Sequence, residues 1–340
     1  MKICDSILVN KIWCKKTFCV PLYPVNNMKL PMVSCSNISK KYASVEALKD
    51  ITFDVSQGEI FGVIGPDGSG KTTLFRILTT LMLADSGTAT VNGLDVVKDF
   101  KAIRNSVGYM PGRFSLYQDL TVEENLNFFA RVFNTTIEEN YDLVKDIYAQ
   151  IEPFRKRRAG ALSGGMKQKL ALSCALIHKP SVLFLDEPTT GVDPVSRKEF
   201  WGMLKNLKRQ GITILVSTPY MDEAALCDRI ALIQYGRFLA IDTPQGITGR
   251  FDEPLWAVQS NRMSQLLSDL RANEHVKSCF AFGDKHHVTI ENGKLTTENG
   301  KWLREYLESK GHQDIEIDRI QPGIEDCFIQ LTAQNSCRFV

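Results

Sequence analysis

The stretch Gly65-Pro66-Asp67-Gly68-Ser69-Gly70-Lys71-Thr72 decides the fold of this chain. It fits the pattern GxxxxGK(S/T) and stands between an apolar run, Ile60–Ile64, and a segment with helical spacing, Thr72–Leu83. Glycines let the backbone curl so that its N–H groups point at phosphate oxygens, and the dipole of the following helix adds to this anion site. The pattern therefore predicts that Lys71 reaches the β- and γ-phosphates of a nucleotide and that the Thr72 hydroxyl ligates Mg²⁺.

A second signal is Val182-Leu183-Phe184-Leu185-Asp186-Glu187, an apolar strand that ends in two carboxylates. In α/β folds, ligands bind at the carboxyl ends of the strands. We expect Asp186 to hold Mg²⁺, directly or through water, and Glu187 to orient or deprotonate the attacking water. Alone, such an ending usually marks a solvated strand end, but the phosphate-binding loop upstream favours the catalytic interpretation.

The predicted elements around these motifs are typical of an α/β fold. Residues 32–64 contain short strands, and the buried strands Val182–Leu185 and Ile212–Val216 are separated by a predicted helix, Ser196–Lys208. This alternation implies βαβ units and a mainly parallel sheet. Further helices are predicted at Val122–Val132, Tyr141–Ile151 and Gly164–Ile177.

The pattern changes near Gly246–Pro254, and beyond it predicts the order β-α-β-β-α-β, which indicates a small ferredoxin-like α+β domain. The elements are expected at Leu255–Val258, Met263–Leu270, Cys279–Phe282, His287–Ile290, Lys301–Ser309 and Ile315–Ile320. We expect Cys327 to be a packed residue of a terminal helix. The pair His286-His287 is expected on an exposed strand, without partners for a metal ion.

Composition narrows the function classes. Lys plus Arg (41) nearly balances Asp plus Glu (39), and the net charge of +2 gives no electrostatic case for a nucleic-acid partner. The apolar runs are short, so none is expected to span a bilayer. The nine cysteines are scattered without a CxxC pair, which favours reduced thiols in a cytosolic protein.

The first 31 residues do not fit a signal peptide. Lys11 interrupts one apolar stretch, and Pro21 and Pro24 interrupt the other. We expect this leader to be disordered or not translated, with Met28 or Met32 as a natural start.

A third motif points to a family. Leu162-Ser163-Gly164-Gly165-Met166-Lys167-Gln168 resembles the LSGGQ signature of ATP-binding cassette (ABC) proteins. Ser163 and the N–H groups of Gly164 and Gly165 stand at a helix N-terminus and present donors to an anion. In the family, that anion is the γ-phosphate held by the other cassette of a head-to-tail dimer. An N-capped helix start explains Ser163 alone, but not the ordered set of three motifs.

The resemblance covers roughly residues 32–245 and implies further site residues. Tyr42 matches the aromatic residue that stacks on adenine, although an ordinary strand tyrosine remains an alternative. Gly191-Val192-Asp193 matches the D-loop, which crosses the dimer interface. The residues thus implied to bind the nucleotide are Tyr42, Gly65, Pro66, Asp67, Gly68, Ser69, Gly70, Lys71, Thr72, Thr73, Ser163, Gly164, Gly165 and Asp193.

The segment Tyr220-Met221-Asp222-Glu223-Ala224 and the separate C-terminal domain resemble the bacterial export class of cassettes. The resemblance implies an ATPase with ATP and Mg²⁺ as cofactors, peripheral on the inner face of the cell membrane, with a separate permease and a second cassette as partners. It predicts a leader over residues 1–31, a nucleotide-binding domain over 32–248 with a helical subdomain at about 113–180, and a C-terminal domain over 249–340.

Two departures from the family pattern matter. Gly112 stands where the family has a glutamine, and Pro219 stands where it has a histidine that contacts the γ-phosphate. Neither residue has a side-chain donor or acceptor, and one lost polar contact costs roughly 10²–10³ in rate. We therefore expect this site to turn over slowly and the chain to pair with a different, competent cassette. Gln118 is not expected to replace the missing glutamine, because that group must sit at a fixed distance from the attacking water.

A second class of function remains open: a soluble ABC protein that uses ATP to switch shape on a ribosome or DNA. Such proteins usually carry two cassettes, whereas this chain has one phosphate-binding loop and one signature. It also shows no basic linker or arm. Both observations favour the transporter subunit.

Overall fold

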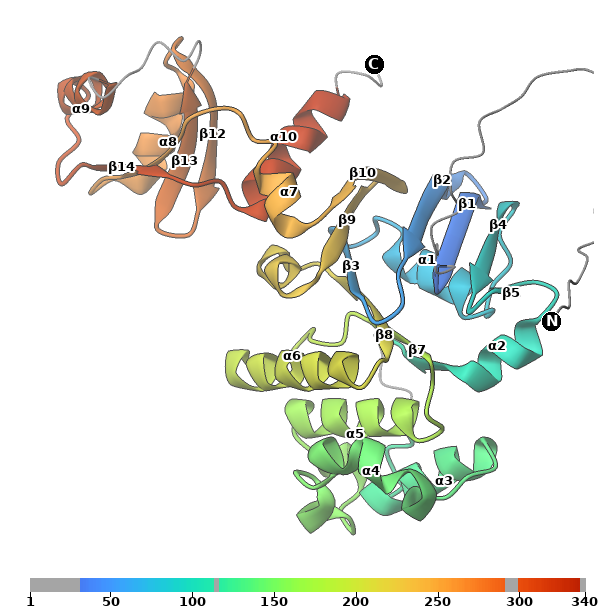
Figure 1. Ribbon diagram of the computed structural model, residues 1–340. Helices are drawn as coiled ribbons and strands as arrows, with labels where there is room; N and C mark the ends of the chain where they lie inside the picture. Colours follow the sequence, from blue (N-terminus) through green and yellow to red (C-terminus); the bar gives the residue numbers. More distant parts are fainter. Residues whose placement is uncertain (1–30, 113–115, 291–298, 337–340) are drawn as a thin grey trace, which may run out of the picture. The chain divides into compact units, whose positions relative to one another are not determined.

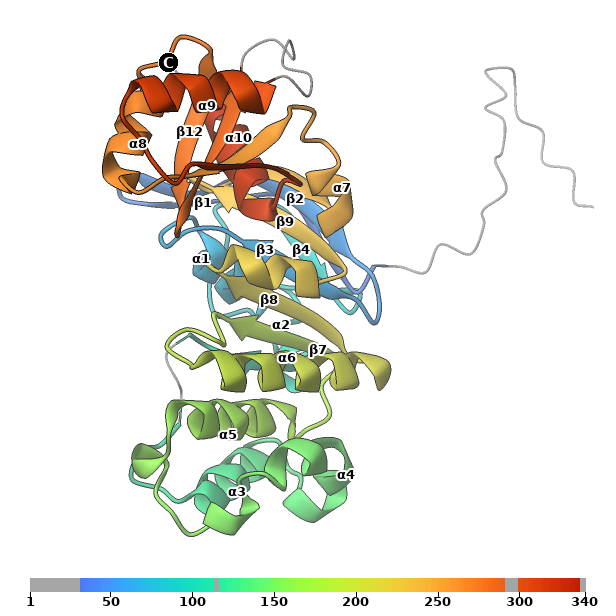
Figure 2. The same cartoon turned by 90° about the vertical axis from the view of Figure 1, so that its left-hand side faces the viewer.

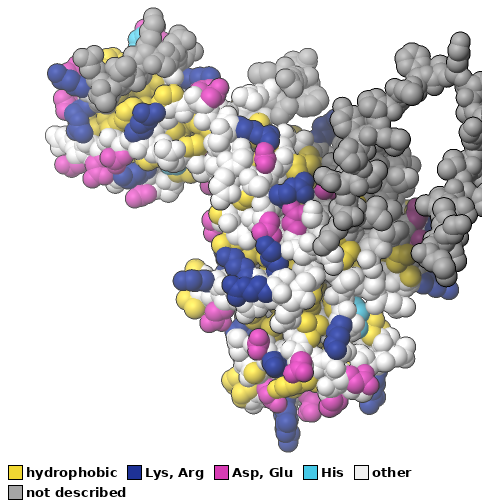
Figure 3. Space-filling view, in the orientation of Figure 1, with side chains coloured by type: hydrophobic (Ala, Val, Ile, Leu, Met, Phe, Trp, Pro, Cys, Tyr) yellow, Lys and Arg dark blue, Asp and Glu magenta, His cyan; other side chains and the backbone are white. Residues whose placement is uncertain are grey.

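The computed structural model describes residues 31–112, 116–290 and 299–336, so the predicted leader, apart from Pro31, lies outside the described residues. No helix in the described part of the chain is long and apolar enough to cross a membrane. Figure 1 shows the elements in sequence colours, and Figure 2 shows them from the side. Cationic and anionic side chains are interspersed over the face drawn in Figure 3, as the balanced composition predicts.

The phosphate-binding loop lies on a six-stranded sheet of order β10-β9-β3-β8-β7-β6. Its neighbouring strands are parallel except for the antiparallel pair β9 and β10. Parallel pairing brings the carboxyl ends of β3, β7 and β8 to one edge of the sheet, where ligands of α/β proteins bind. The strands are β3 (Ile60–Ile64), β6 (Val107–Met110), β7 (Val182–Asp186), β8 (Thr213–Thr218), β9 (Arg229–Gln234) and β10 (Arg237–Asp242).

A second, four-stranded antiparallel sheet of order β2-β1-β4-β5 comes from the beginning of the described chain. Its strands are β1 (Val33–Tyr42), β2 (Val45–Val55), β4 (Ser86–Val91) and β5 (Leu94–Asp95). Phe61 and Phe184 from one face of the parallel sheet share a core with this sheet and with Phe75 of α1 (Lys71–Leu78). The helix that follows the phosphate-binding loop is therefore packed between two sheets.

The other face of the parallel sheet is covered by α5 (Gly164–Leu176) and α6 (Pro194–Arg209), whose apolar residues share a core with Leu183 and Leu185. Beside α5 pack α3 (Val122–Val132) and α4 (Ile137–Tyr148), as both ribbon views show. The short α2 (Phe100–Ser106) precedes β6. This mixed α/β cassette has the predicted fold class.

Two predicted helices have limits that differ from the structure by three residues or more. The helix expected over Thr72–Leu83 ends at Leu78, because Thr80 adopts φ +62° and its N–H turns back to Ile77. The helix expected from Tyr141 begins at Ile137. Thr136 there forms a capping box with Glu139 and so satisfies the first helical N–H groups.

The predicted β-α-β-β-α-β order is present in the C-terminal part, as a sheet of order β12-β13-β11-β14 whose neighbours are all antiparallel. The helices cover one face, with Val258, Leu266, Val288 and Leu303 in their common core. The elements are β11 (Leu255–Gln259), α8 (Met263–Arg271), β12 (Val276–Phe282), β13 (Lys285–Ile290), α9 (Asn299–Ser309) and β14 (Glu316–Ile320).

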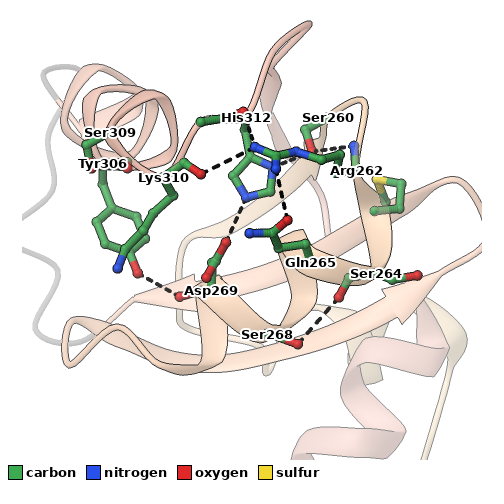
Figure 4. A network of polar contacts seen from close by, with 12 residues as sticks. Ser260, Arg262, Ser264, Gln265, Ser268, Asp269, Tyr306, Ser309, Lys310 and His312 are labelled. Carbon is green, nitrogen blue, oxygen red and sulfur yellow. Dashed lines mark hydrogen bonds and ion pairs between the residues drawn. The ribbon is translucent and has the colours of Figure 1, made fainter.

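A buried polar network joins three of these segments (Figure 4). The ring of His312 is fully buried, and its Nδ1 lies 3.0 Å from Ser260 Oγ while its Nε2 lies 3.0 Å from Asp269 Oδ2. The Tyr306 hydroxyl donates to the Asp269 carbonyl oxygen. Ser260 is only 6% exposed and also accepts from the Arg262 N–H, so the buried network links the three segments.

The last described helix, α10 (Ile324–Ser336), contacts both the cassette and the C-terminal sheet. Cys327 is buried in the cassette core, as predicted, and lies 3.7 Å from the Ile247 carbonyl oxygen of α7 (Pro244–Thr248). On the sheet side, Asp326 lies 2.7 Å from His287 Nδ1. The expectation of exposed histidines was wrong. His286 is 5% exposed because it points to the helical face, where Nε2 bonds Met263 O.

Candidate nucleotide-binding site

The phosphate-binding loop runs from the end of β3 to the start of α1 and depends on its glycines. Gly68 and Gly70 adopt φ of +75° and +109°, values that disfavour residues with a Cβ atom. A Cβ atom on Gly70 would lie 2.4 Å from Ala47 O, and one on Gly65 would lie 2.2 Å from Ile233 O. The strands behind the loop therefore fix its curl at both ends.

The Lys71 side chain lies inside this curled loop and is only 3% exposed. Its Nζ donates to Gly65 O at 2.8 Å and to Pro66 O at 3.0 Å, and lies 3.1 Å from Glu187 Oε1. Ser69 Oγ is also buried and has no hydrogen-bond partner among the described residues. A buried ammonium group and an orphaned hydroxyl beside curled backbone form a donor set that fits a phosphate group.

The end of β7 supplies the two carboxylates. Asp186 Oδ1 accepts from Thr72 Oγ1 at 3.2 Å and from Ser217 Oγ at 2.6 Å, and Asp186 is 2% exposed. The Glu187 N–H donates to Ser217 O at 3.0 Å, and Glu187 adopts φ +49°. The hydroxyl and carboxylate oxygens of Thr72 and Asp186 are the hard ligands that Mg²⁺ prefers, so this pair fits the ion.

Tyr109, on the neighbouring strand β6, lies in the same electrostatic environment. Burial raises the pKa of its phenol to about 12, and the nearby Asp186 carboxylate adds to this effect. The phenol is therefore neutral at physiological pH and adds no negative charge beside Asp186.

The signature segment forms the exposed start of α5. Ser163 is the N-cap and accepts from the Met166 N–H at 3.4 Å, while Ser163 and Gly164 are exposed to solvent. Gly165 is buried, and a Cβ atom there would lie 2.7 Å from Ser196 Oγ in α6. The exposed helix N-terminus thus presents its N–H groups outward.

Asp193 caps the next helix, α6. Its Oδ1 accepts from the Val195 N–H at 3.1 Å and from the Ser196 N–H at 2.9 Å. These hydrogen bonds, chiefly those from Ser196, hold the pKa of the Asp193 carboxyl below its usual range. In the single chain this carboxylate stabilises a helix start, and its contact with nucleotide stays a prediction.

The other predicted contacts lie around the loop. Tyr42, at the end of β1, is 41% exposed, and its hydroxyl lies 2.7 Å from Met82 Sδ. Much of the ring is therefore open to a ligand. Asp67 is highly exposed, with Oδ1 3.9 Å from Lys71 Nζ, and Thr73 is half-buried in the first turn of α1.

Gly112 lies close to the two carboxylate residues. A Cβ atom on Gly112 would lie 3.1 Å from Asp186 O and 3.7 Å from Glu187 Cβ, so a side chain there would begin beside Glu187. Pro219 directly follows Thr218, the last residue of β8. Gln118 is engaged elsewhere: its side-chain Nε2 donates to Leu116 O at 3.3 Å, and its backbone carbonyl oxygen accepts from the Gly160 N–H.

Sequence reasoning missed Ser217, which bonds both carboxylate residues. A signal was present, because Ser217 and Thr218 are hydroxyl residues at the end of an otherwise apolar strand. Their role depends on β8 lying next to β7, with Asp186 opposite Ser217, and that register is a tertiary property.

The sequence matches the family described as ABC transporter over residues 48–190. It is 42% identical over 308 residues to the probable multidrug ABC transporter ATP-binding protein YbhF of Escherichia coli (strain K12), a match that covers 88% of this chain and 52% of that protein. The Nod factor export ATP-binding protein I of Rhizobium sp. (strain N33) is 31% identical over 307 residues, covering 89% of this chain and 97% of that protein.

Among solved structures, the dimeric post-hydrolysis state of the ATP-binding cassette MJ0796 bound to ADP and Pi has a TM-score of 0.57 at 25% identity. The match covers 62% of this chain and 98% of that cassette.

The parallel sheet, the phosphate-binding loop and the strand-end carboxylates together define a P-loop ATPase cassette. With these relatives, the chain belongs to the ABC transporter ATP-binding proteins, which confirms the family predicted from the signature. It spans about half the length of YbhF, 52% of which lies within the match.

Proposed function

We propose that this chain is the ATP-binding subunit of an exporter, peripheral on the inner face of the membrane, and that it couples MgATP to export of a small molecule through a separate permease. The names of its relatives, one a probable multidrug transporter protein and one an export protein, support this assignment. The ATP-binding part of the proposal is carried by the 3.1 Å contact between Lys71, in the phosphate-binding loop, and Glu187, directly after β7.

The residues then have distinct roles. Nucleotide phosphates replace the Gly65, Pro66 and Glu187 oxygens as the partners of the Lys71 ammonium group. This exchange releases the Glu187 carboxylate to accept a proton from the attacking water. Thr72 and Asp186 would hold Mg²⁺, which supplies positive charge to the phosphate oxygens when bound.

The same proposal includes slow turnover at this site. Lys71 contacts Glu187, but Gly112, where a Cβ atom would lie 3.7 Å from Glu187 Cβ, offers only backbone, and Pro219 lacks even an N–H donor. Each missing contact to developing charge costs roughly 10²–10³ in rate, whereas ground-state binding through the loop is untouched. The site should bind ATP well and hydrolyse it slowly.

A slow site and an intact signature together favour a heterodimer. In a head-to-tail pair, Ser163 and Gly164 of this chain would complete the partner's site, and their exposure in the single chain leaves them available. A partner with both polar groups would supply the fast site. A homodimer would instead contain two impaired sites.

The experiment measures ATP turnover by the isolated chain and by the assembled transporter. The isolated chain should turn over well below about 1 s⁻¹, the lower end of the usual enzyme range. In the assembly, Ser163→Arg should reduce activity more than Glu187→Gln, because the first damages the partner's fast site. Turnover of about 1 s⁻¹ or faster by the isolated chain would refute the slow site, and the reverse order of the two variants would refute the heterodimer.

A further inference from the structure

A second charged cluster lies beside the nucleotide site, and Arg197 is at its centre. Arg197 belongs to the first turn of α6 and is half-buried. Its guanidinium carbon lies 4.1 Å from the centroid of the Tyr220 ring, within the range of a cation–π contact. Its Nε lies 3.6 Å from Glu223 Oε1, and its Nη1 lies 3.4 Å from Asp222 Oδ2.

Glu223 is the buried partner in this cluster. It lies in the 3₁₀ helix Met221–Leu226 and is 1% exposed. A buried carboxylate is costly unless it is paired and hydrogen-bonded. Among the described residues, Arg197 is the only Lys, Arg or His whose nitrogen lies within 4.0 Å of Glu223. Arg197 is therefore the ion-pair partner of Glu223, through a 3.6 Å contact that is too long for a hydrogen bond.

Glu223 in turn holds the end of strand β8. Its Oε2 accepts from Thr218 Oγ1 at 2.6 Å, and Thr218 is fully buried. The same Thr218 Oγ1 accepts from the Tyr220 N–H at 3.1 Å. The segment that contains Pro219 is thus closed by a side-chain hydrogen bond on one side and by the stacked Tyr220 ring on the other.

Thr218 connects this closed segment to the nucleotide site. Its carbonyl oxygen accepts from the Gly65 N–H at 3.2 Å, at the first residue of the phosphate-binding loop. Its neighbour Ser217 bonds Asp186 and the Glu187 N–H. A continuous series of contacts therefore leads from Arg197 through Glu223 and β8 to the phosphate-binding loop and to the two carboxylate residues.

We propose that Arg197 is a positioning residue for ATP hydrolysis, which it serves by clamping residues 218–223 against the phosphate-binding loop. The inference rests on the proposed function, since it assigns Arg197 a role in the reaction of that site. Arg197 touches neither loop nor carboxylates in the contacts above and acts through Glu223 and Tyr220. Because Pro219 offers no side-chain donor, the position of this segment depends on the clamp.

The contacts of Arg197 fix the position of residues 218–223 relative to the phosphate-binding loop. ATP hydrolysis depends more strongly on such positions than ATP binding does. A displacement of about 1 Å at a reacting group can cost roughly 10²-fold in rate. ATP binding through the loop N–H groups and Lys71 tolerates a larger displacement, because its free energy is distributed over several contacts. Loss of the clamp should therefore lower kcat and leave ATP affinity nearly unchanged.

The test uses the full chain with the double variant Arg197→Gln/Glu223→Gln. Replacing both charges avoids stranding the buried carboxylate, and the amide oxygen introduced by Glu223→Gln still accepts from the Thr218 hydroxyl. We expect kcat for ATP to fall by about 10-fold or more, with the Kd for ATP within about 2-fold. The control is Arg209→Gln at the exposed end of the same helix, where Arg209 bonds only Asn206 in the contacts described.

Two tyrosine variants separate the ring from its hydroxyl. Tyr220→Phe keeps the stacked ring and should behave like the wild type, whereas Tyr220→Leu should reproduce the loss of kcat. A double variant with wild-type kcat would overturn the proposal. So would a fall in kcat matched by an equal loss of ATP affinity and of Tm, because that result indicates a merely structural role.

A second readout keeps this test separate from that of the proposed function. Hydrogen exchange at the Gly65 and Tyr220 amides, whose acceptors are both on Thr218, should speed up in the double variant even if the wild type shows no measurable turnover. Unchanged exchange would overturn the clamp. Fast wild-type turnover would overturn only the slow site, because the ratio of kcat values would still be measurable.

Discussion

The phosphate-binding loop and the positions 112 and 219 differ in the polar groups that they bring to the candidate site. In the loop, Lys71 is held by Gly65 O, Pro66 O and the Glu187 carboxylate, and neither end of the loop tolerates a Cβ atom. By contrast, Gly112, where a Cβ atom would lie 3.7 Å from Glu187 Cβ, and Pro219, directly after β8, bring no polar side chain. This difference is the basis of our proposal that the site binds phosphate well but lacks two polar groups that would assist bond cleavage beside Glu187.

The largest effect is expected from a substitution in the phosphate-binding loop. Lys71→Ala removes the buried ammonium group and should weaken MgATP binding by about 100-fold or more, since truncating one member of a desolvated charge pair costs roughly 2–5 kcal/mol. Titration calorimetry measures the affinity, with Lys208→Ala as control because Lys208 pairs with Asp228 on the surface. Unchanged affinity for MgATP in the Lys71 variant would remove this residue from the site.

Introducing polar side chains at positions 112 and 219 should give the next largest effect. The double variant Gly112→Gln/Pro219→His supplies both missing polar groups and should raise kcat by about 10-fold or more, with little change in ATP affinity. The glutamine must shift its surroundings slightly, because a Cβ atom at 112 lies 3.1 Å from Asp186 O.

The matched control for this restoration is Gly202→Gln, since a Cβ atom on Gly202 meets nothing within 4 Å. It introduces the same residue on an open face of α6 and should leave turnover unchanged. If the double variant hydrolyses ATP no faster than the wild type, the two positions do not limit the rate.

The parts of the site that could be predicted from the sequence are those that short segments encode. The loop from Gly65 to Thr72 and the Asp186-Glu187 ending each combine a local motif with one apolar strand, so their positions followed from spacing alone. Helix α3 also matched its predicted range, because a capping box at Thr121 and Glu124 reinforces the apolar period.

The parts that escaped prediction depend on pairs distant in sequence. Arg197 and Glu223 meet only because α6 and the segment after β8 return to the same edge of the sheet. Likewise, His286 is buried by packing against α8, which no local pattern of charge or hydropathy indicates. Local motifs identify which residues carry the chemistry, whereas tertiary packing decides what positions those residues.

The smallest predicted effect concerns Tyr42, at the end of β1 and away from Glu187 in the sequence. It tests whether the protein binds ATP mainly through the phosphates. Tyr42→Leu removes the exposed ring and should weaken ATP binding by about 5- to 10-fold, since an aromatic contact contributes roughly 0.5–1.5 kcal/mol beyond its buried area. Tyr42→Phe loses only the hydroxyl next to Met82 and should bind like the wild type.

Inorganic tripolyphosphate completes the test of Tyr42, because it carries the phosphates of ATP without the base. Tyr42→Leu should leave its affinity unchanged, whereas Lys71→Ala should weaken tripolyphosphate and ATP alike. Competition calorimetry against ATP gives both constants. Equal losses for the two ligands in Tyr42→Leu would mean that the ring supports the loop and does not stack on the base. Because the ring and the loop come from different sheets, additive losses in the double variant Lys71→Ala/Tyr42→Leu are expected from independent contacts.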